Sequence, residues 1–412
     1  MNKNKKSLNI HKDKNISNNS VHYKNNKSII MKTTNSINNI KRKNNLFNSI
    51  NPKRQKTNNR LIEPQNYKDI FNYEDKFQWI EAIKEELENM KNLNVFKTVK
   101  KLPEGANVIK SRWVFKYKKD SEGNIIKRKV RLVAKGFTQK YGIDFKDTFS
   151  PILKPDSIRI LTSIAAQNNF SIQQIDVNAA YLNANLKKDI YMSAPEGHTD
   201  YGKYFWKLNE ALCGLKQSAK EWNDELNSQL KNIGFKRISS KPCLYVKLSK
   251  NKKIKYLIGV YVDDIIITGT NFEIKRTIHA IKNKFKIKEI GEVDFIIGIK
   301  FIKHKDSYFI NQKRYTKEIL QKFNMENCTA LKNMNPVDIE EYKKIKFDHT
   351  TYRIAIGNLI YLAINTRPDI LFAVNKASRR SKEPNLNDWM NVQKIFRYLK
   401  RNFRLWNQLL KK

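Results

Sequence analysis

Apolar residues recur at regular spacing only after Leu61, and the first such pattern is helical. Residues three or four apart share a helix face. That face carries Trp79, Ile83, Leu87 and Met90, and charged residues occupy the other faces. The pattern predicts an amphipathic helix over about residues 75 to 92, whose role is packing rather than chemistry.

Between Val108 and Thr138 the pattern changes to two runs rich in β-branched and aromatic residues, joined by Lys-Asp-Ser-Glu-Gly-Asn. Such runs around a polar turn predict a β-hairpin, and its many Lys and Arg residues make it basic. Further along, we expect a helix over 157 to 167, a strand over 171 to 177, and a helix over 218 to 233 that ends at Gly234.

The second half of the chain begins with another hairpin and then becomes helical. Its strands are expected over about 254 to 262 and 265 to 269, and the helix after them carries Ile274, Ile278, Ile281 and Phe285 on one face. Val293 to Ile302 and Tyr308 to Ile310 are predicted as strands. From Tyr315 onward, helices are expected near 315 to 324, 351 to 363, 367 to 380 and 386 to 401. The mixture predicts an α+β fold.

Composition limits the class of protein. The 412 residues, 40% of them hydrophobic, can form two or three packed units. Cys213, Cys243 and Cys328 have no Cys-x-x-Cys spacing, which argues against a disulfide framework or a zinc knuckle and favours a reducing compartment. The most apolar stretch, Tyr256 to Thr268, contains two aspartates. We therefore expect no membrane association and an intracellular location, which the family resemblance described below narrows to a cytoplasmic particle and/or the nucleus.

The formal charge of +42 points to a polyanionic partner, and nucleic acid is the first candidate. The chain is rich in Lys, Asn and Ile together, so the codon bias of an AT-rich genome is another explanation for part of the lysine excess. Residues 1 to 60 contain 15 Lys and Arg residues against one acid and are predicted to be a disordered basic arm. Within the arm, 41 to 43 and 53 to 56 resemble a two-part nuclear localisation signal, although so basic a segment produces such clusters by chance.

Asp263 and Asp264 are adjacent carboxylates between the apolar runs of the second hairpin. Like charges at a hairpin tip repel each other and resist burial unless a cation neutralises them. A hydrated turn is the simpler explanation for Asp-Asp in general. However, turns favour Asn-Gly or Asp-Gly rather than Asp followed by three isoleucines. A divalent metal ion is therefore expected here.

A third carboxylate should come from another strand end, and Asp176 supplies it at the end of the predicted strand over 171 to 177. Two divalent ions roughly 3.5 to 4 Å apart can activate a 3′-hydroxyl and stabilise a leaving pyrophosphate. Carboxylate oxygens suit Mg²⁺. We predict two magnesium ions, with Mn²⁺ as a substitute, held by Asp176, Asp263 and Asp264, and we include Val177 in the metal site.

Six strings of the sequence resemble, in the same order, those of copia-type (Pseudoviridae-like) LTR retrotransposon reverse transcriptases. They are Ser-Arg-Trp-Val-Phe-Lys-Tyr-Lys (111 to 118), Arg-Leu-Val-Ala-Lys-Gly-Phe-Thr-Gln (131 to 139), Asp-Val-Asn-Ala-Ala-Tyr-Leu (176 to 182), Gly-Leu-Lys-Gln-Ser-Ala-Lys-Glu-Trp (214 to 222), Tyr-Val-Asp-Asp-Ile (261 to 265) and Thr-Arg-Pro-Asp-Ile (366 to 370). The resemblance covers about residues 61 to 402. A single Tyr-Val-Asp-Asp is a weak signal, but six ordered blocks are not expected by chance.

The resemblance implies a right-hand polymerase fold, with an antiparallel palm sheet backed by helices. Its implied parts are an N-terminal helical extension (61 to 100), fingers (101 to 170), a palm with a primer-grip hairpin (171 to 302) and a helical thumb or connection (303 to 412). The implied function is that of an RNA-directed DNA polymerase, part of a Pol polyprotein. Its partners would be an RNA template, a DNA or RNA primer, dNTPs and other Pol segments such as integrase and RNase H.

The same resemblance assigns the nucleotide site. Asp176 matches the first palm carboxylate, and Asp263 and Asp264 match the catalytic pair. Tyr181 matches the position whose ring lies under the incoming sugar and excludes a ribose 2′-hydroxyl, although an ordinary packed aromatic would look the same.

In the basic hairpin, Arg131 and Lys135 are the candidates for contact with the triphosphate. Arg128 and Lys129 are near alternatives, and a solvated charged strand face is the competing explanation.

Two further blocks concern the template and primer. Lys216 and Gln217 belong to the block that packs against the template base and the nucleotide. Phe295 to Ile299 resembles the primer grip, and a buried strand with a glycine for close approach is compatible with that role. The implied template and primer contacts are Lys216, Tyr261, Phe295, Ile296 and Gly298.

Other parts of a Pol polyprotein are not recognised in the sequence. The chain stops about where an RNase H domain should begin, and neither a protease motif nor an integrase zinc constellation is found. We expect an excised, truncated or decayed piece of a polyprotein. An active polymerase and a catalytically silent nucleic-acid-binding remnant both remain open, whereas a purely structural protein would leave the three carboxylates without a purpose.

Overall fold

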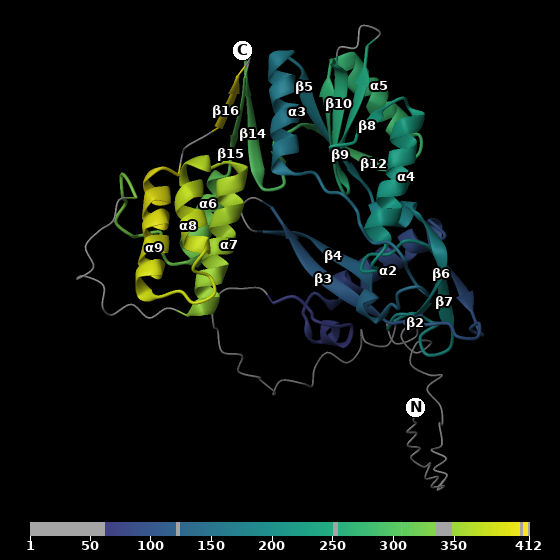
Figure 1. Cartoon of the computed structure of the whole chain (residues 1–412). Coiled ribbons are helices and arrows are strands. Elements are labelled where there is room, and N and C mark those ends of the chain that lie inside the picture. Colours follow the sequence, from purple (N-terminus) through teal and green to yellow (C-terminus); the bar gives the residue numbers. More distant parts are fainter. Residues whose placement is uncertain are drawn as a thin grey trace, which may run out of the picture. The chain divides into compact units, whose positions relative to one another are not determined.

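An antiparallel six-stranded sheet is the largest sheet in the computed structural model, which describes residues 62–120, 124–249, 254–305, 307–334, 348–403 and 407–410. These residues fall within one compact unit, Glu63–Lys412, apart from Ile62, and the predicted arm over 1 to 60 lies outside them. The strand order is β12-β5-β11-β10-β9-β8. Figure 1 labels β5, β8, β9, β10 and β12 of this sheet. The strands are β5 Ser171–Val177, β8 Lys236–Ile238, β9 Lys241–Leu248, β10 Ile254–Tyr261, β11 Asp264–Gly269 and β12 Ile287–Glu292.

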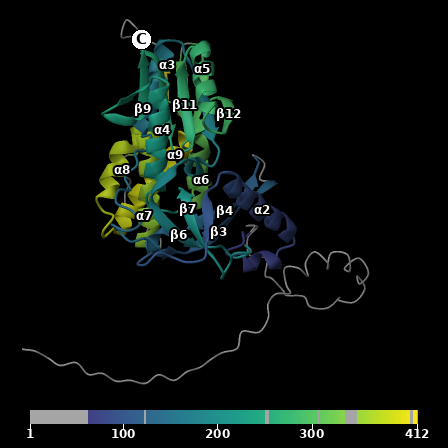
Figure 2. The ribbon, with the colours of Figure 1, turned by 90° about the vertical axis from the view of Figure 1, so that its right-hand side faces the viewer.

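Helices cover both faces of this sheet. Along β11, Ile265 and Ile267 belong to the core shared with α4 (Ser218–Asn232) and α5 (Asn271–Lys282), whereas Ile266 belongs to the core shared with α3 (Pro155–Gln167). Neighbouring residues of a strand point to opposite faces, so the run of three isoleucines is buried on both. Figure 2 shows α3, α4 and α5 beside these strands.

The predicted basic hairpin is present as β3 (Ser111–Lys119) and β4 (Ile125–Ala134), paired antiparallel, and the predicted amphipathic helix as α2 (Lys76–Asn92). Trp79 of α2 packs edge-on against Phe115 of β3, with ring centroids 5.5 Å apart. A four-stranded sheet shares this core. Its strands are β1 Phe96–Val99, β7 Phe205–Glu210, β6 Asn185–Ser193 and β2 Val108–Ile109.

A smaller sheet carries the segment predicted as the primer grip. Its strands are β13 Phe295–Ile296, β14 Ile299–His304, β15 Ser307–Asn311 and β16 Asn407–Leu410. The prediction of a single strand over Val293 to Ile302 is wrong, because the chain reverses at Ile297 and Gly298 and β13 pairs with β14. β16 also departs from the prediction that the chain is helical from Tyr315 onward.

The predicted helices after Tyr315 are otherwise confirmed as α6 (Lys313–Lys322), α7 (His349–Asn365), α8 (Leu371–Ser378) and α9 (Leu386–Arg401), with a 3-10 turn, η6 (Pro368–Ile370), before α8. Arg367, which is buried, forms an ion pair with Asp369 at 2.7 Å and donates to the carbonyl of Asn402. The Thr-Arg-Pro-Asp-Ile block therefore fastens the start of α8 to the end of α9.

The α+β prediction is confirmed. The hydrophobic cores, however, do not follow the predicted domain boundaries along the chain. One core runs from Ile70 to Leu215 and joins α2, the basic hairpin and the β6–β7 pair. Another joins α3, inside the segment 101 to 170 expected to form the fingers, to the six-stranded sheet. No helix among the described residues combines the length and apolarity needed to cross a membrane.

Candidate active site

Three aspartates meet where two strand ends adjoin in the six-stranded sheet. Asp176 near the end of β5 is the direct cross-strand partner of Asp264, the first residue of β11. Directly opposite side chains of an antiparallel pair lie about 4.5–5.5 Å apart at Cβ. Asp263 precedes Asp264 in the turn after β10, and its carbonyl accepts a hydrogen bond from the amide of Val177 at 2.9 Å. The sheet register therefore brings together the three carboxylates that the sequence predicts.

The pKa of two of these carboxyl groups departs from its ordinary value. Burial raises the pKa of Asp176, and the neighbouring charges of Asp263 and Asp264 raise it further, against the opposing effect of Lys129 and Lys288. Burial also raises the pKa of Asp264, as does Asp263, whereas a hydrogen bond from the Gln174 amide at 3.0 Å lowers it. Burial and the neighbouring like charges thus disfavour the ionised forms of both groups, an electrostatic imbalance.

That imbalance fits a divalent cation, and carboxylate oxygens are the ligands that magnesium prefers. The residues that could hold it are Asp176, Asp263 and Asp264. In the part of the chain that the structure describes, no group of three or more His, Cys, Asp or Glu side chains converges closely enough to form a metal site. The fit to magnesium thus rests on the type of donor, since all three side chains are carboxylates, and not on a formed metal site. Val177 adds no side-chain donor, since its side chain is aliphatic and buried.

The turn that carries Asp263 has an unusual backbone. Val262 has φ 55°, a left-handed conformation that a β-branched residue rarely adopts and that costs about 1–3 kcal/mol. The indole nitrogen of Trp222 donates to the carbonyl of Val262 at 2.8 Å. Trp222 is buried and packs edge-on against Phe285, with ring centroids 5.1 Å apart. The sequence predicts Trp222 only as a core residue of a helix, and its spacing gives no sign of this hydrogen bond.

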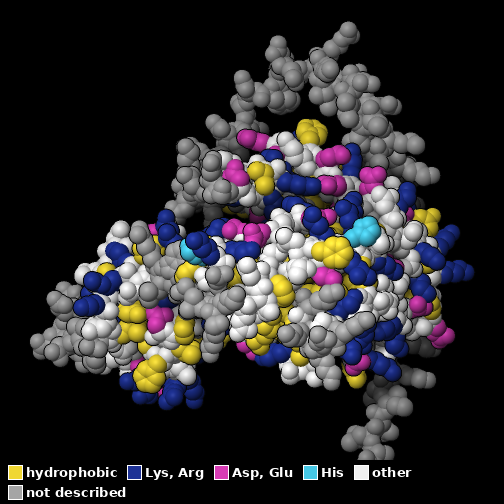
Figure 3. Space-filling model, turned by 90° about the horizontal axis from the view of Figure 1, so that it is seen from above, with side chains coloured by type: hydrophobic (Ala, Val, Ile, Leu, Met, Phe, Trp, Pro, Cys, Tyr) yellow, Lys and Arg dark blue, Asp and Glu magenta, His cyan; other side chains and the backbone are white. Residues whose placement is uncertain are grey.

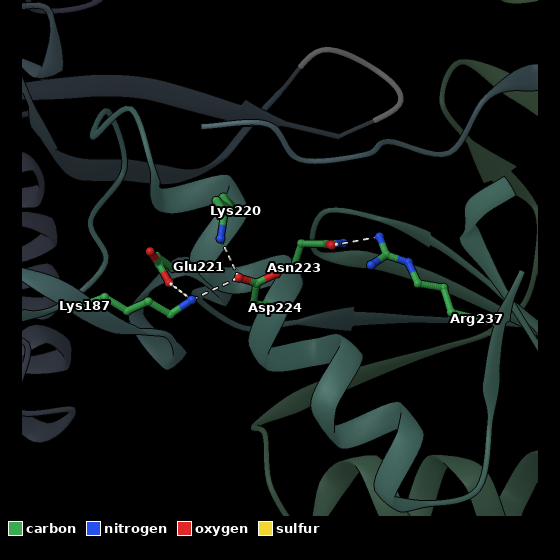
Figure 4. A network of polar contacts seen from close by, with 6 residues as sticks. All are labelled: Lys187, Lys220, Glu221, Asn223, Asp224 and Arg237. Atoms are coloured by element: carbon green, nitrogen blue, oxygen red, sulfur yellow. Dashed lines mark hydrogen bonds and ion pairs between the residues drawn. The ribbon is translucent and has the colours of Figure 1, made fainter. Parts of the chain in front are cut away.

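Helix α4, which carries Trp222, is tied to the strands on both sides of it (Figure 4). Lys187 of β6 reaches Glu221 at 3.2 Å and Asp224 at 3.1 Å, and Asp224 also accepts from Lys220 at 2.7 Å. On the other side, Arg237 of β8 donates to Asn223. Exposed ion pairs of this kind stabilise little by themselves, but together they fix the helix between two strands.

The two faces of strand β4 differ in chemistry. Val130 and Leu132 are buried in the core shared with α2, and Arg128 on that face pairs with Asp75 of the loop before α2 at 2.8 Å. Lys129 and Arg131 alternate with these residues and so lie on the opposite face.

Lys129 and Arg131 are the cations of β4 whose charges reach the site, and Lys288 of β12 is the cross-strand neighbour of Asp176. Lys129 acts on the pKa of Asp176, and Arg131 acts on that of Tyr181. Of the predicted triphosphate residues, these two lie toward the aspartates. Arg128 is held on the other face, and Lys135 follows the end of β4, where the chain enters η3 (Gly136–Thr138).

Tyr181 lies in a short 3-10 turn, η4 (Ala180–Asn183), directly after the left-handed Ala179. Burial raises the pKa of Tyr181, and Asp263 and Tyr261 add to that rise, while Arg131 lowers it. The ring is therefore half-buried, with Tyr261, Asp263 and Arg131 of the basic β4 face around it. This is the surrounding that a residue beneath a bound nucleotide would have, although packing alone could also account for it.

Gln217 belongs to a buried polar network, which Lys216, itself exposed, joins through its backbone amide. Gln217 is buried, and its amide donates to the carbonyl of Asp144 at 3.0 Å and accepts from Gln139 at 2.9 Å. The backbone amide of Lys216 donates to Gln139, and its ammonium lies 4.7 Å from the ring centroid of Phe145. A nucleotide contact by the Gln217 side chain stays a prediction. Its partners give it a role in fixing the loop over 139 to 145.

The grip segment ends in a second turn with positive φ. Ile297 has φ 48° and Gly298 has φ 69°, so both turn residues are left-handed, the pattern of a type I′ hairpin. Phe295 is exposed, whereas Ile296 is buried in the core beneath the six-stranded sheet. Val262 and Asp263 form the turn between β10 and β11, here called the catalytic turn. Tyr261, which directly precedes this turn, packs against the same core. The predicted primer contacts and the catalytic turn therefore share one core.

A family model described as reverse transcriptase (RNA-dependent DNA polymerase) matches residues 93–337. The chain belongs to the reverse transcriptase family. The "Retrovirus-related Pol polyprotein from transposon TNT 1-94" of Nicotiana tabacum is 36% identical over 355 residues, which cover 82% of this chain and 26% of that protein. The corresponding polyprotein from transposon RE1 of Arabidopsis thaliana is 36% identical over 330 residues, or 78% of this chain and 22% of that protein.

A "Putative transposon Ty5-1 protein" of Saccharomyces cerevisiae is 28% identical over 235 residues, which cover 55% of this chain and 75% of that protein. The predicted copia-type retrotransposon reverse transcriptase is thereby confirmed as the family. The chain spans about a quarter of the length of the two plant polyproteins that it matches.

The surface of this reverse transcriptase is strongly basic, as nucleic-acid binding requires. On the face drawn in Figure 3, Lys and Arg side chains are spread widely, with Asp and Glu side chains among them. The whole sequence has 81 Lys and Arg residues against 39 Asp and Glu residues. Charge spread in this way favours binding along a phosphate backbone without reading its sequence.

Proposed function

We propose that this chain is an RNA-directed DNA polymerase that extends a primer with deoxynucleotides on an RNA template. The observation that carries the proposal is the cross-strand pairing of Asp176 with Asp264, with Asp263 beside them. In the reaction, the primer 3′-oxygen bonds to the α-phosphorus of a dNTP, the bond to pyrophosphate breaks, and the hydroxyl proton leaves. When bound at these carboxylates, two magnesium ions would lower the pKa of the 3′-hydroxyl and offset the charge on the leaving pyrophosphate.

The residues around the aspartates suit a bound nucleotide. Lys129 and Arg131 present cations on the strand face nearest Asp176, where the triphosphate of the incoming nucleotide would bind. Tyr181, half-buried beside Asp263, would support the sugar and exclude a ribose 2′-hydroxyl. Gln217 would act indirectly, by holding the loop that Lys216 lies against.

The proposed activity implies the arrangement of a right hand. We assign the hairpin β3–β4 with its core to the fingers, the six-stranded sheet with α3, α4 and α5 to the palm, and α6 to α9 to the thumb or connection. In this assignment α3 moves to the palm, because its apolar side chains share the core of that sheet. The β13–β14 hairpin would be the primer grip, which holds the primer 3′ end near the aspartates.

Primer extension on poly(rA)/oligo(dT) with magnesium tests the proposal. The chain should incorporate dTTP, and Asp263→Asn should reduce incorporation by about 10³-fold while leaving duplex binding largely in place. Asp189→Asn is the matched control, because Asp189 is an exposed aspartate that pairs with Lys207 outside the site. A wild-type chain that binds the duplex but incorporates nothing would instead be a catalytically silent nucleic-acid-binding protein.

A further inference from the structure

The turn of the β13–β14 hairpin is held by a side chain from the helical region. The hydroxyl of Tyr361 on α7 donates to the carbonyl of Ile297 at 2.6 Å. The bond joins residues 64 positions apart in the sequence. It is made to the first turn residue, a β-branched isoleucine with φ 48°. A conformation that isoleucine rarely adopts persists only when its surroundings over-determine it.

The second turn residue leaves room for this contact. A Cβ on Gly298 would lie 2.7 Å from the Tyr361 hydroxyl oxygen, closer than real Cβ contacts, and φ there is 69°. Only glycine meets both requirements without displacing the tyrosine. The turn and the tyrosine therefore fit each other at two consecutive residues.

Tyr361 is itself fixed from the helical side. Tyr315 of α6 packs edge-on against its ring, with centroids 4.9 Å apart, and the Tyr315 hydroxyl donates to Asn358 of α7 at 2.9 Å. The end of α7 is also fastened to α3, because Arg159 donates to the carbonyls of Ile364 and Asn365 at 2.9 and 2.7 Å. The hydroxyl therefore has little freedom to leave the turn.

The same tyrosine lies near the catalytic turn. Burial raises the pKa of Tyr361, and the neighbouring Tyr261 adds to that rise, so the hydroxyl is protonated and can donate at neutral pH. Tyr261 is the residue directly before Val262 and the aspartates. Tyr361 thus contacts the hairpin turn directly and lies within electrostatic reach of the residue before the catalytic turn.

We propose that Tyr361 is a positioning residue for the primer 3′ end, and that through it the helical region α6 to α9 sets the place of the grip turn relative to the aspartates. The proposal rests on the polymerase function and on the role of β13–β14 as the primer grip. Tyr361 touches neither the reacting atoms nor the primer in this role. It acts through Ile297 and Gly298, so its loss should alter how the chain recognises a primer end.

Tyr361→Phe, which removes only the hydroxyl, tests this role. The readout is fluorescence anisotropy in EDTA with two duplexes, one with a recessed 3′ end on a longer template and one blunt. The wild-type chain should prefer the recessed end, and Tyr361→Phe should reduce that preference about fivefold, the effect of one lost hydrogen bond. With magnesium, the KM for the primer should rise by a similar factor while kcat changes less.

Tyr352→Phe is the matched control. Tyr352 lies on the same helix, is fully buried, and donates its hydroxyl to a backbone carbonyl, that of Ala377, at 2.8 Å. This variant should lower the melting temperature and leave the preference for a recessed end unchanged.

Two outcomes overturn the proposal alone: an unchanged preference in Tyr361→Phe, or an equal loss in both variants, which would reflect a general weakening of α7. A wild-type chain that binds neither duplex contradicts the polymerase function as well.

Discussion

The catalytic turn and the grip turn are built alike but serve different ends. Each is a two-residue hairpin turn whose first residue is β-branched with positive φ, Val262 in one and Ile297 in the other. In each, a single aromatic side chain donates to the carbonyl of that residue, Trp222 at 2.8 Å and Tyr361 at 2.6 Å. The second residue differs, and it decides what the turn does: Asp263 offers a carboxylate, whereas Gly298 offers space.

The origin of the two donors also differs. Trp222 lies on α4, which packs on the same six-stranded sheet as the turn that it holds. Tyr361 lies on α7, whose buried residues form a separate core with α8 and α9. The catalytic turn is therefore held within one packed unit, and the grip turn is held across two. This teaches that the carboxylates are fixed locally, while the primer side depends on how two cores meet.

The largest effects are expected from exchanging the second turn residues, with Gly placed at 263 or Asp placed at 298. Asp263→Gly should fold, because a glycine suits a hairpin turn, yet primer extension should fall by about 10³-fold through loss of a carboxylate. Gly298→Asp should instead lower the melting temperature, because its Cβ would meet the Tyr361 hydroxyl. Extension assays and thermal melts on both variants check this. If Asp263→Gly kept its activity, the carboxylate at 263 would have no catalytic part.

Removing the donor of the catalytic turn should have the next largest effect. Trp222→Phe keeps the buried ring but loses the bond to Val262, so the carboxylate geometry should loosen and kcat should fall by about 10- to 100-fold. Primer affinity should be unchanged, in contrast to Tyr361→Phe.

The control for Trp222→Phe is Trp206→Phe. Trp206 is also buried, and its indole donates to Asp200 at 3.0 Å in another core. Steady-state kinetics and anisotropy on both variants separate the cases. An equal fall in kcat would mean that any buried indole bond matters as much, and would remove Trp222 from this role.

Replacing Ile297, which has a strained left-handed backbone, tests whether the grip turn depends on the Tyr361 hydrogen bond. Asn adopts the left-handed conformation more readily, and Asn-Gly is the favoured type I′ pair, so Ile297→Asn should make the turn less dependent on its donor. In that background, Tyr361→Phe should reduce the recessed-end preference only about twofold, instead of fivefold. A double-mutant cycle measured by anisotropy checks the coupling, and additive losses would mean that Tyr361 does not act through the turn.

The smallest expected effect concerns the charge of Asp176, the β5 residue that pairs with Asp264 next to the catalytic turn. The pKa of Asp176 is raised above its ordinary 3.8, so the fold favours its protonated form and loses stability as pH rises through the raised pKa. Without metal, Asp176→Asn should therefore melt higher than the wild type near neutral pH, by up to about 2 °C. The advantage should disappear as pH falls toward 3.8.

Asp189→Asn controls for the loss of one charge, because Asp189 is an exposed partner of Lys207 outside the site. It should bring no rise in melting temperature. A gain in Asp176→Asn that persists at low pH would not be electrostatic.

The sequence predicts those elements whose own pattern is strong. The strand over 171 to 177, the hairpin with Asp263 and Asp264 and the helix over 386 to 401 are confirmed within a residue or two. The strands β1, β6, β7, β8, β9 and β12 are missed, because charged residues interrupt the apolar pattern of each and its pairing depends on a partner strand. Local pattern does not encode such pairing.

Part of the candidate site can also be predicted from the sequence, and part cannot. The carboxylates carry their own chemistry and are recognised along the chain, but the hydrogen bonds of Trp222 and Tyr361 depend on the three-dimensional fold. In sequence, both aromatics look like ordinary apolar helix positions. The left-handed φ at Val262 and Ile297 is equally hidden, because these residue types normally avoid it.

The pairing of Asp176 with Asp264 has a consequence for how this enzyme could fail. Side chains alternate along a strand, so a slip of β11 by one residue against β5 would send Asp264 to the face opposite Asp176. The isoleucines that follow it would stay buried, because both faces of the sheet are covered by helices. No intermediate register keeps the carboxylates together. Under the proposed function, damage to the pairing would thus abolish nucleotide incorporation in one step, rather than leave a slow polymerase that copies with errors.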